Sequence, residues 1–269
     1  MLLLKLTSGF KARMYLVGKI EEKIKYLKER GTPDGSTLGA MYFTKDDKDP
    51  TKKLTKQQVI DNALYLIIAG TETSSSTLTN MIFLLGLHPE VYQKLKEEQQ
   101  TLIRSKGETL TKEILDNDLP YLDGVVKETM RIILVCGSPL RLSNRTITMG
   151  EYQIPKNWLV IFSIALTHEH DPTTKLDDGS HMDLIKGFKP ERWLDQKTCP
   201  KEYMPWGMGH HSCAGCYLAM AEMKTFLATF CRRVKEFDLV HNEVDVNDIK
   251  WKHGAIVMPK DGVPIIIRN

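Results

Sequence analysis

The segment from Thr55 to about Gly86 constrains the fold most, because it predicts one helix roughly 45 Å long at the standard rise per residue. Thr55 and Gln58 have the spacing of a capping box, which marks the start of this helix. Its centre, ALYLIIAG, is apolar on every side. A helix without a polar face needs neighbours all round, so we expect it to pass through the core.

Most of the remaining chain is also typical of helices, with strands in the last third. Further helices are predicted over residues 10–30, 88–107 and 121–135. The segments RTITM and YQIP predict a strand hairpin around Gly150, and two strands joined at residues 259–262 end the chain. WLVIFSIAL reads as a buried segment that is either strand or helix. The expected fold class is therefore mainly α with minor β (α+β).

Composition excludes some classes of protein without identifying a function. The 269 residues are 42% hydrophobic and 26% charged, which is ordinary for a globular protein. A net charge of +3 without a basic run argues against nucleic acid as a partner. An odd number of cysteines, five, favours a reducing, intracellular location over a disulfide framework. The apolar start of the chain is too short to span a bilayer.

The segment MPWGMGHHSCAGC, residues 204–216, contains two histidines and two cysteines and could bind a metal. A structural zinc site needs four ligands, but the sequence has no second C-x-x-C to complete the pair Cys213 and Cys216. A redox C-x-x-C would need a thioredoxin-like context, which the sequence does not indicate. A surface loop with incidental cysteines is the simplest alternative.

Glycines around Cys213 favour a different ligand. Gly207, Gly209 and Gly215 would let the backbone approach a flat molecule closely. A cysteine just before a helix has its thiolate stabilised by the N-terminal end of that helix. One such thiolate is enough for an axial ligand of haem iron.

Polar residues interrupt the apolar centre of the long helix. Burying Glu72 and Thr73 without partners would be costly, so we expect them to meet partners or water. Gly70 and the neighbouring hydroxyl residues could open the helix locally to admit a ligand or water. We predict a proton-delivery role for Glu72 and Thr73. The hydroxyls of residues 74–77 are expected to donate to carbonyls of their own helix.

A third group is KETMR, residues 127–131, where Glu128 and Arg131 stand at i and i+3 and can form an ion pair. Alone, such a pair is usually a solvated surface contact of little energy. It gains weight from its position between the helix with Glu72 and the segment FKPERW at residues 188–193.

These segments, in this order, resemble the cytochrome P450 family of haem-thiolate monooxygenases, from about Gly9 to the C-terminus. The loop W-G-x-G-x-H-x-C-x-G is similar to the family's haem-binding signature, with Cys213 at the iron-ligand position. AGTETS resembles the oxygen-activating helix, and Glu128 and Arg131 match the E-x-x-R pair. PERW adds Arg192 as third member of a structural Glu–Arg–Arg network. The segments are most similar to the branch that oxidises sterols and other isoprenoids.

The resemblance also implies residues that contact haem b. Trp206 stands where phenylalanine is usual, and Gly215 closes the signature. His211 replaces the usual arginine, but it can still donate to a haem propionate. Arg141 matches another propionate-binding arginine, and a loop arginine in solvent explains it equally well. Cys216 is then a small residue in the first turn of the next helix.

The implied reaction inserts one oxygen atom from O2 into a C–H bond of a hydrophobic small molecule. Electrons would come from NAD(P)H through a reductase or ferredoxin, and Glu72 and Thr73 would deliver protons. The family's N-terminal half has no counterpart in residues 1–269, so we expect a partial domain: a fragment, an incomplete gene model or a degenerate copy. The alternative is a non-catalytic haem- or zinc-binding fragment. A membrane location is expected only if an anchor precedes the chain.

Overall fold

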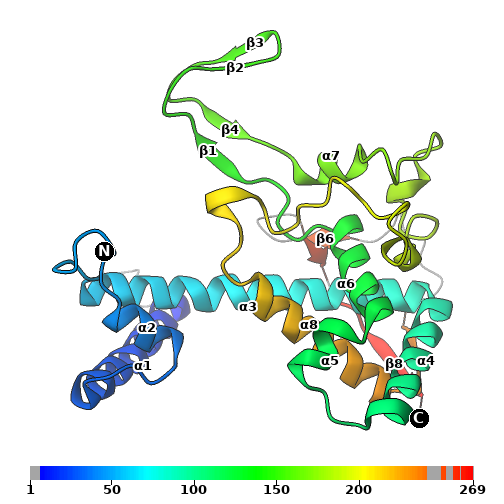
Figure 1. The fold of residues 1–269 in the computed structure, drawn as a ribbon, viewed down its shortest axis with the longest axis horizontal. Helices are drawn as coiled ribbons and strands as arrows, with labels where there is room; N and C mark the ends of the chain where they lie inside the picture. Colours follow the sequence, from blue (N-terminus) through cyan, green and yellow to red (C-terminus); the bar gives the residue numbers. More distant parts are fainter. Residues whose placement is uncertain (1–6, 241–249, 253–256, 261, 269) are drawn as a thin grey trace. The chain divides into compact units, whose positions relative to one another are not determined.

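The computed structural model describes residues 7–240, 250–252, 257–260 and 262–268 (Figure 1). The chain divides into two compact units, Met1–Thr71 and Glu72–Asn269. The α-helices are α1 (Ser8–Arg30), α2 (Thr37–Phe43), α3 (Lys56–Leu87), α4 (Pro89–Lys106), α5 (Lys112–Asn117), α6 (Pro120–Ile132), α7 (Ile164–Glu169) and α8 (Cys216–Arg233). Within the described ranges, none of them combines the length and apolar character needed to cross a membrane.

The first unit contains α1, α2 and the start of α3. The predicted first helix is confirmed, and it ends at Gly31, whose φ of 74° and N–H bond to the Leu27 carbonyl close the last turn. Apolar side chains from α1 and α3 form its core: Ile20, Ile24, Val59, Ile60 and Ala63. Lys56 and Glu21 form an ion pair between the same two helices. The amphipathic pattern of α1 is therefore satisfied by the first turns of α3.

Helix α3 begins as predicted, because Thr55 and Gln58 cap each other reciprocally at 2.9 and 3.2 Å. It continues to Leu87 without interruption at Gly70, so the expected local opening of the helix is wrong. The prediction that it is buried throughout is also wrong, since Tyr65 is 70% and Ile68 64% exposed. The buried apolar residues of α3 lie in its first and last thirds. Those of the first third belong to the core of the first unit, and those of the last third belong to the core of the second unit. An apolar sequence did not reveal which faces are covered.

The second unit is built around α6, which packs against α4, α7, α8 and the short helix η3 (Pro190–Trp193). The helices predicted over 88–107 and 121–135 are confirmed, although the second ends at Ile132. Both have proline in their first turn, where no hydrogen bond is lost. Fully buried residues from four helices meet in one core: Leu84, Leu95, Leu122, Val125, Val126, Leu227 and Ala228. This core fixes α6 and α8, which carry or adjoin the candidate site.

The strands that the structure describes form antiparallel pairs. They are β1 (Leu140–Leu142) with β4 (Leu159–Ile161), β2 (Ile147–Met149) with β3 (Tyr152–Ile154), β5 (Glu236–Leu239) with β8 (Ile265–Arg268), and β6 (Trp251–Lys252) with β7 (Met258–Pro259). The β2–β3 pair is the predicted hairpin, turning at Gly150 with a φ of 59°. Mainly helical with small sheets, the protein has the predicted fold class.

One strand prediction needs correction. WLVIFSIAL is both strand and helix, since it contains β4 and the start of α7, and Trp158, Leu159 and Ile161 are exposed rather than buried. The two predicted C-terminal strands are present as β7 and β8, and each pairs with an earlier strand, β7 with β6 and β8 with β5. The pairing with β5 seats Leu239 against α3, where a Cβ on Gly86 would collide with it. Residues 253–256 and 261 of this prediction lie outside the described residues.

Candidate functional site

Cys213 lies exposed in the loop that leads into α8. Its N–H donates to the carbonyl of Trp206 at 2.8 Å, which folds the segment between them into a closed loop. Gly207 and Gly209 make this possible, because their φ values of 69° and 64° lie in the left-handed region that glycine adopts without strain. The short helix η4 (Gly209–His211) completes the loop. The glycines predicted to shape this loop are therefore used for its backbone conformation.

Space is left open beside the thiol. A Cβ added to Gly215 would lie 3.9 Å from the Cys213 sulfur, and one added to Gly209 would meet nothing within 4 Å. Gly215 is also the N-cap residue of α8, so Cys213 lies two residues before the cap, at the N-terminal end of this helix. An exposed thiol flanked by glycines, which have no side chain, leaves room for a broad, flat ligand that binds one thiolate.

Three further residues were predicted to contact such a ligand. Trp206 is half-buried and packs against the core of the second unit, which anchors the loop. His211 is exposed in η4. Arg141, on β1, donates to the Leu140 carbonyl at 2.8 Å, and its guanidinium lies 6.0 Å from the centre of the Phe162 ring. The structure thus groups Trp206, His211, Cys213 and Gly215 in one loop, and places Arg141 on a separate strand.

The residues predicted for proton delivery lie on α3. Glu72 is exposed and Thr73 is half-buried, so the prediction that both sit inside a buried helix is wrong for Glu72. Thr77 donates to the Thr73 carbonyl at 3.0 Å, and Ser75 to that of Glu72 at 3.1 Å. These two hydroxyls bond their own helix, as predicted. The hydroxyl of Ser76 instead donates to the Met258 sulfur at 3.4 Å, a long-range contact that local sequence does not reveal.

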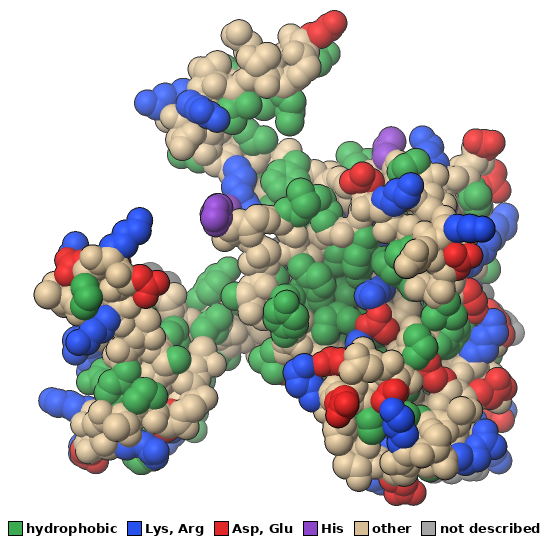
Figure 2. All heavy atoms as spheres, in the orientation of Figure 1, with side chains coloured by type: hydrophobic (Ala, Val, Ile, Leu, Met, Phe, Trp, Pro, Cys, Tyr) green, Lys and Arg blue, Asp and Glu red, His purple; other side chains and the backbone are tan. Residues whose placement is uncertain are grey.

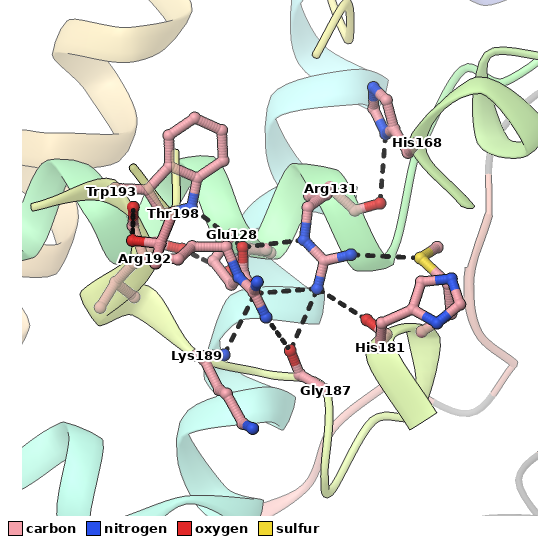
Figure 3. Close-up of polar contacts among 12 residues, drawn as sticks. Glu128, Arg131, His168, His181, Gly187, Lys189, Arg192, Trp193 and Thr198 are labelled. Carbon is pink, nitrogen blue, oxygen red and sulfur yellow. Dashed lines mark hydrogen bonds and ion pairs between the residues drawn. The ribbon is translucent and has the colours of Figure 1, made fainter. Parts of the chain in front are cut away.

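The best-defined polar cluster surrounds the Glu128 carboxylate (Figure 3). Arg131 donates to both of its oxygens, from Nε and Nη2, each at 2.9 Å. Arg192 donates from Nε to the same carboxylate at 2.9 Å. Glu128 and Arg131 are 0% and 1% exposed. Taken alone, the pair was expected to be a solvated contact. The structure instead brings all three predicted members together in the interior.

Other groups satisfy the remaining donors and acceptors of this cluster. The Trp193 indole N–H and the Lys189 backbone N–H donate to Glu128 at 2.9 and 3.1 Å. Arg131 Nη2 also donates to the carbonyls of His181 and Gly187 at 2.9 and 3.0 Å. A buried ion pair is stabilising only when its hydrogen bonds are completed in this way. The cluster therefore ties α6 to the segment 181–193.

Two glycines permit this close approach. A Cβ on Gly124 would lie 2.9 Å from the Pro190 carbonyl, so α6 can touch η3 only without a side chain there. A Cβ on Gly187 would lie 2.6 to 2.7 Å from three carbonyl oxygens. Neither glycine belongs to a motif that marks this role in the sequence.

Sequence reasoning also missed buried polar residues between this cluster and the Cys213 loop. His168 and Asp171 are 1% and 0% exposed. The Tyr203 ring stacks on His168 with centres 5.5 Å apart, and it meets the Trp193 ring edge-on at 4.6 Å. Burial raises the pKa of the Tyr203 hydroxyl, and the charges of Asp123 and Glu128 raise it further. The run HEHD at 168–171 was the one available signal for these residues.

A metal-ion site of the zinc type has no counterpart within the described ranges. In residues 7–240, 250–252, 257–260 and 262–268, no three His, Cys, Asp or Glu side chains come together in a group that could hold a metal ion. A haem site needs only one thiolate from the protein, and the Cys213 loop offers one.

A mainly helical fold, a thiol exposed just before a helix and a buried Glu–Arg–Arg cluster are the features expected from the resemblance to haem-thiolate proteins. The model of the family "Cytochrome P450" matches residues 6–266. The chain belongs to the cytochrome P450 family.

Relatives and a solved structure support this membership. Cytochrome P450 26A1 of Gallus gallus is 30% identical over 265 residues, which cover 95% of this chain and 51% of the relative. Abscisic acid 8'-hydroxylase 2 of Arabidopsis thaliana is 30% identical over 260 residues, covering 96% and 50%. The structure titled "Retinoic acid bound cyanobacterial CYP120A1" superposes with a TM-score of 0.79 at 27% identity, covering 96% of this chain and 56% of that one. The chain thus spans about half the length of these relatives.

Proposed function

We propose that residues 1–269 form the C-terminal, haem-binding part of a P450 domain that acts as a monooxygenase. The reaction inserts one oxygen atom from O2 into a C–H bond of a hydrophobic small molecule. One observation carries this proposal: the thiol of Cys213 stands exposed in a glycine-shaped loop before α8, in a fold that matches a cytochrome P450. A loop with incidental cysteines would not need two left-handed glycines to present one thiol.

In this proposal the haem b iron is held by the Cys213 thiolate. Bound haem supplies the oxygen and one-electron chemistry. Trp206 anchors the loop in the core, and Gly215 keeps the space beside the sulfur open. His211 is exposed and can donate to a propionate, as can Arg141 if it exchanges its present bond to Leu140. The protein's part is to bind and orient the group.

Glu72 and Thr73 are proposed to handle protons. Because Glu72 is exposed, its carboxylate can exchange protons with water. Thr73 is half-buried one residue further along α3, where its hydroxyl can order a water molecule. An exposed acid followed by a half-buried hydroxyl could pass protons from solvent toward the interior, whereas a fully buried pair would have no contact with solvent.

The names of two relatives support a proposal for the class of substrate that this protein binds. One relative is a hydroxylase named for abscisic acid, and the solved relative is described with bound retinoic acid. We propose a hydrophobic isoprenoid of similar size as substrate, and NAD(P)H as electron source through a reductase or ferredoxin. An intracellular location is part of the proposal, because an odd number of cysteines, five, does not suit a disulfide framework.

Oxygen incorporation tests the activity. The longest natural form of the protein that contains this chain, supplied with a redox partner and ¹⁸O2, is expected to place one ¹⁸O atom in retinoic or abscisic acid. Thr73→Ala should keep its haem content but release more peroxide per NAD(P)H consumed than wild type, if the hydroxyl organises proton transfer. Mass spectrometry and a peroxide assay give both quantities.

Ser75→Ala is the matched control, because this hydroxyl donates to a carbonyl of its own helix. It should leave the ratio of product to peroxide unchanged. Equal ratios in wild type and Thr73→Ala would assign Thr73 a purely structural hydroxyl. A haem-loaded, reducible protein that incorporates no ¹⁸O into either acid would contradict the proposed substrate class.

Taken alone, the 269-residue chain is expected to bind less than one haem per chain, to self-associate and to lack coupled turnover. Large apolar side chains are exposed on α3, on the β1–β4 pair and on α8: Tyr65, Ile68, Leu140, Leu142, Leu159, Ile161, Tyr217 and Leu218. Figure 2 shows hydrophobic side chains gathered on one face of the second unit. Patches of this kind exceed what soluble monomers usually expose.

Size-exclusion chromatography, haem stoichiometry and turnover with a surrogate reductase test this expectation. A monodisperse, fully haem-loaded chain with coupled hydroxylation would contradict it. Haem binding without turnover would instead support the alternative of a non-catalytic haem-binding fragment, which the exposure of α3 favours.

A further inference from the structure

His168 joins three parts of the second unit through its ring. It lies on α7 with its side chain 1% exposed. Its Nδ1 lies 3.2 Å from the Arg131 carbonyl at the end of α6 (Figure 3). Its Nε2 lies 3.1 Å from the Met204 nitrogen. Met204 begins the segment that continues through Trp206 to Cys213. One imidazole thus connects the helix of the Glu128 cluster with the loop of the candidate ligand.

These two contacts fix the protonation state of the ring. The Met204 N–H can only donate, so Nε2 must offer its lone pair. The Arg131 carbonyl can only accept, so Nδ1 must carry the proton. Both bonds therefore exist only in the neutral Nδ1–H tautomer. A second proton, on Nε2, would face the Met204 N–H and break that bond.

Asp171 supports the same segment from the turn after α7. Its carboxylate is fully buried and accepts the Glu202 N–H and, at 2.7 Å, the Thr173 N–H. Two neighbouring side chains, Asp171 and His168, thus hold the backbone N–H groups of Glu202 and Met204 on the approach to the Cys213 loop. Stacking of His168 on Tyr203, the residue between them, adds a third contact.

Charged groups around His168 act in opposite directions. Burial is the main influence and lowers the pKa of His168, and the Arg131 guanidinium on α6 lowers it further. The Arg131 carbonyl bond, Asp171 and Glu128 oppose this. The nearby His181, on η2 (Ser180–Met182), donates from Nε2 to the Glu169 carbonyl at 2.7 Å and accepts the Leu176 N–H at Nδ1. The net result is a ring that is neutral at pH 7.

We propose that neutral His168 is a positioning residue for the Cys213 loop, acting through Met204, and that protonation of its Nε2 releases the loop. The loss of the Met204 bond follows from the geometry, since a protonated Nε2 cannot accept an N–H. Its consequence for haem retention rests on the proposed function.

Hydrogen exchange of the Met204 amide tests the first part. A histidine whose pKa is lower in the closed state binds fewer protons there than in the open state, so lowering the pH favours opening. Protection, corrected for intrinsic exchange, should be constant above about pH 6.5, the ordinary histidine pKa. It should fall by up to about tenfold per pH unit below that, until the lowered pKa of closed His168 is reached.

Variants of the longest natural form identify the titrating group. His168→Gln can still accept the Met204 N–H but does not titrate, so it should remove the pH dependence and keep part of the protection. His168→Phe keeps the stacking on Tyr203 but loses both bonds, and it should lower protection at every pH. His170→Gln, on the exposed side of α7, should behave as wild type. Far-UV circular dichroism checks that each variant is folded.

Unchanged pH dependence in His168→Gln would assign the titration to another group, such as His181, and overturn the proposal. Flat protection in wild type between pH 5 and 7 would overturn it as well. Haem loss is measured separately, as transfer to excess apomyoglobin. Wild type should lose haem faster at pH 5.5 than at 7.5, and His168→Gln should not. Loop release without any haem binding would leave the positioning role intact and contradict the proposed function instead.

Discussion

Cys213→Ser is expected to abolish the thiolate-type, red-shifted Soret band of the reduced, CO-bound protein. Serine keeps the size and exposure of the side chain but does not supply a thiolate at neutral pH. The loop should still form, since the Cys213 N–H bond to Trp206 involves the backbone. Loss of the band with an unchanged far-UV spectrum would therefore report loss of the iron ligand. The measurement is made on the longest natural form that contains this chain.

Cys216→Ser is the matched control. Cys216 is the first residue of α8 and is half-buried, only three positions from Cys213. Its replacement should leave the band in place. Equal loss of the band in both variants, together with one zinc ion per chain, would reject the haem assignment in favour of a C-x-x-C metal site.

Glu128→Ala is expected to have the largest effect on stability. The substitution would leave Arg131 and Arg192 without the carboxylate that both of them contact, and Arg131 is 1% exposed. Breaking a buried ion pair by removing one partner costs about 3–5 kcal/mol. Since domains are stable by only about 5–15 kcal/mol, a large share of the variant should be unfolded or easily unfolded. Urea denaturation followed by circular dichroism measures the shift in midpoint.

Asp116→Ala provides the comparison, because Asp116 pairs with Lys112 on the exposed face of α5. Exposed pairs contribute little, so its midpoint should stay close to that of wild type. Equal midpoints for Glu128→Ala and wild type would show that the cluster adds nothing to stability. Because Glu128 holds the segment 181–193 against α6, its loss should also lower haem affinity.

Local sequence predicted those features that depend on local contacts. The reciprocal cap of Thr55 and Gln58 and the left-handed Gly31 at the end of α1 follow from residue type and spacing. Burial could not be predicted in the same way. The centre of α3 and the segment around Leu159 are apolar in sequence yet exposed in the structure. Hydropathy shows that a segment can be buried. Whether it is buried depends on packing against elements that are distant in sequence.

The candidate site divides along the same line. The pair Glu128–Arg131 was accessible from its i, i+3 spacing, whereas its burial was not. His168 is separated in sequence from Met204 by 36 residues and from Arg131 by 37. No local sequence pattern could therefore predict either contact. Asp171 reaches Glu202 across 31 residues. The hydrogen bonds from side chains to distant backbone groups, which hold the loop, could not be predicted from the sequence.

The Glu128 cluster also bears on the order of folding. Its carboxylate takes partners from Lys189, Arg192 and Trp193, which follow it by 61, 64 and 65 residues. A growing chain therefore carries this acid, with only Arg131 near it in sequence, through the synthesis of some sixty residues before its other partners emerge from the ribosome. A longer loop costs more entropy to close, and closure must precede the gain from forming the bonds. The first unit closes over a shorter separation, the 35 residues (56 − 21) between Glu21 and Lys56, so its helices can pack earlier during translation.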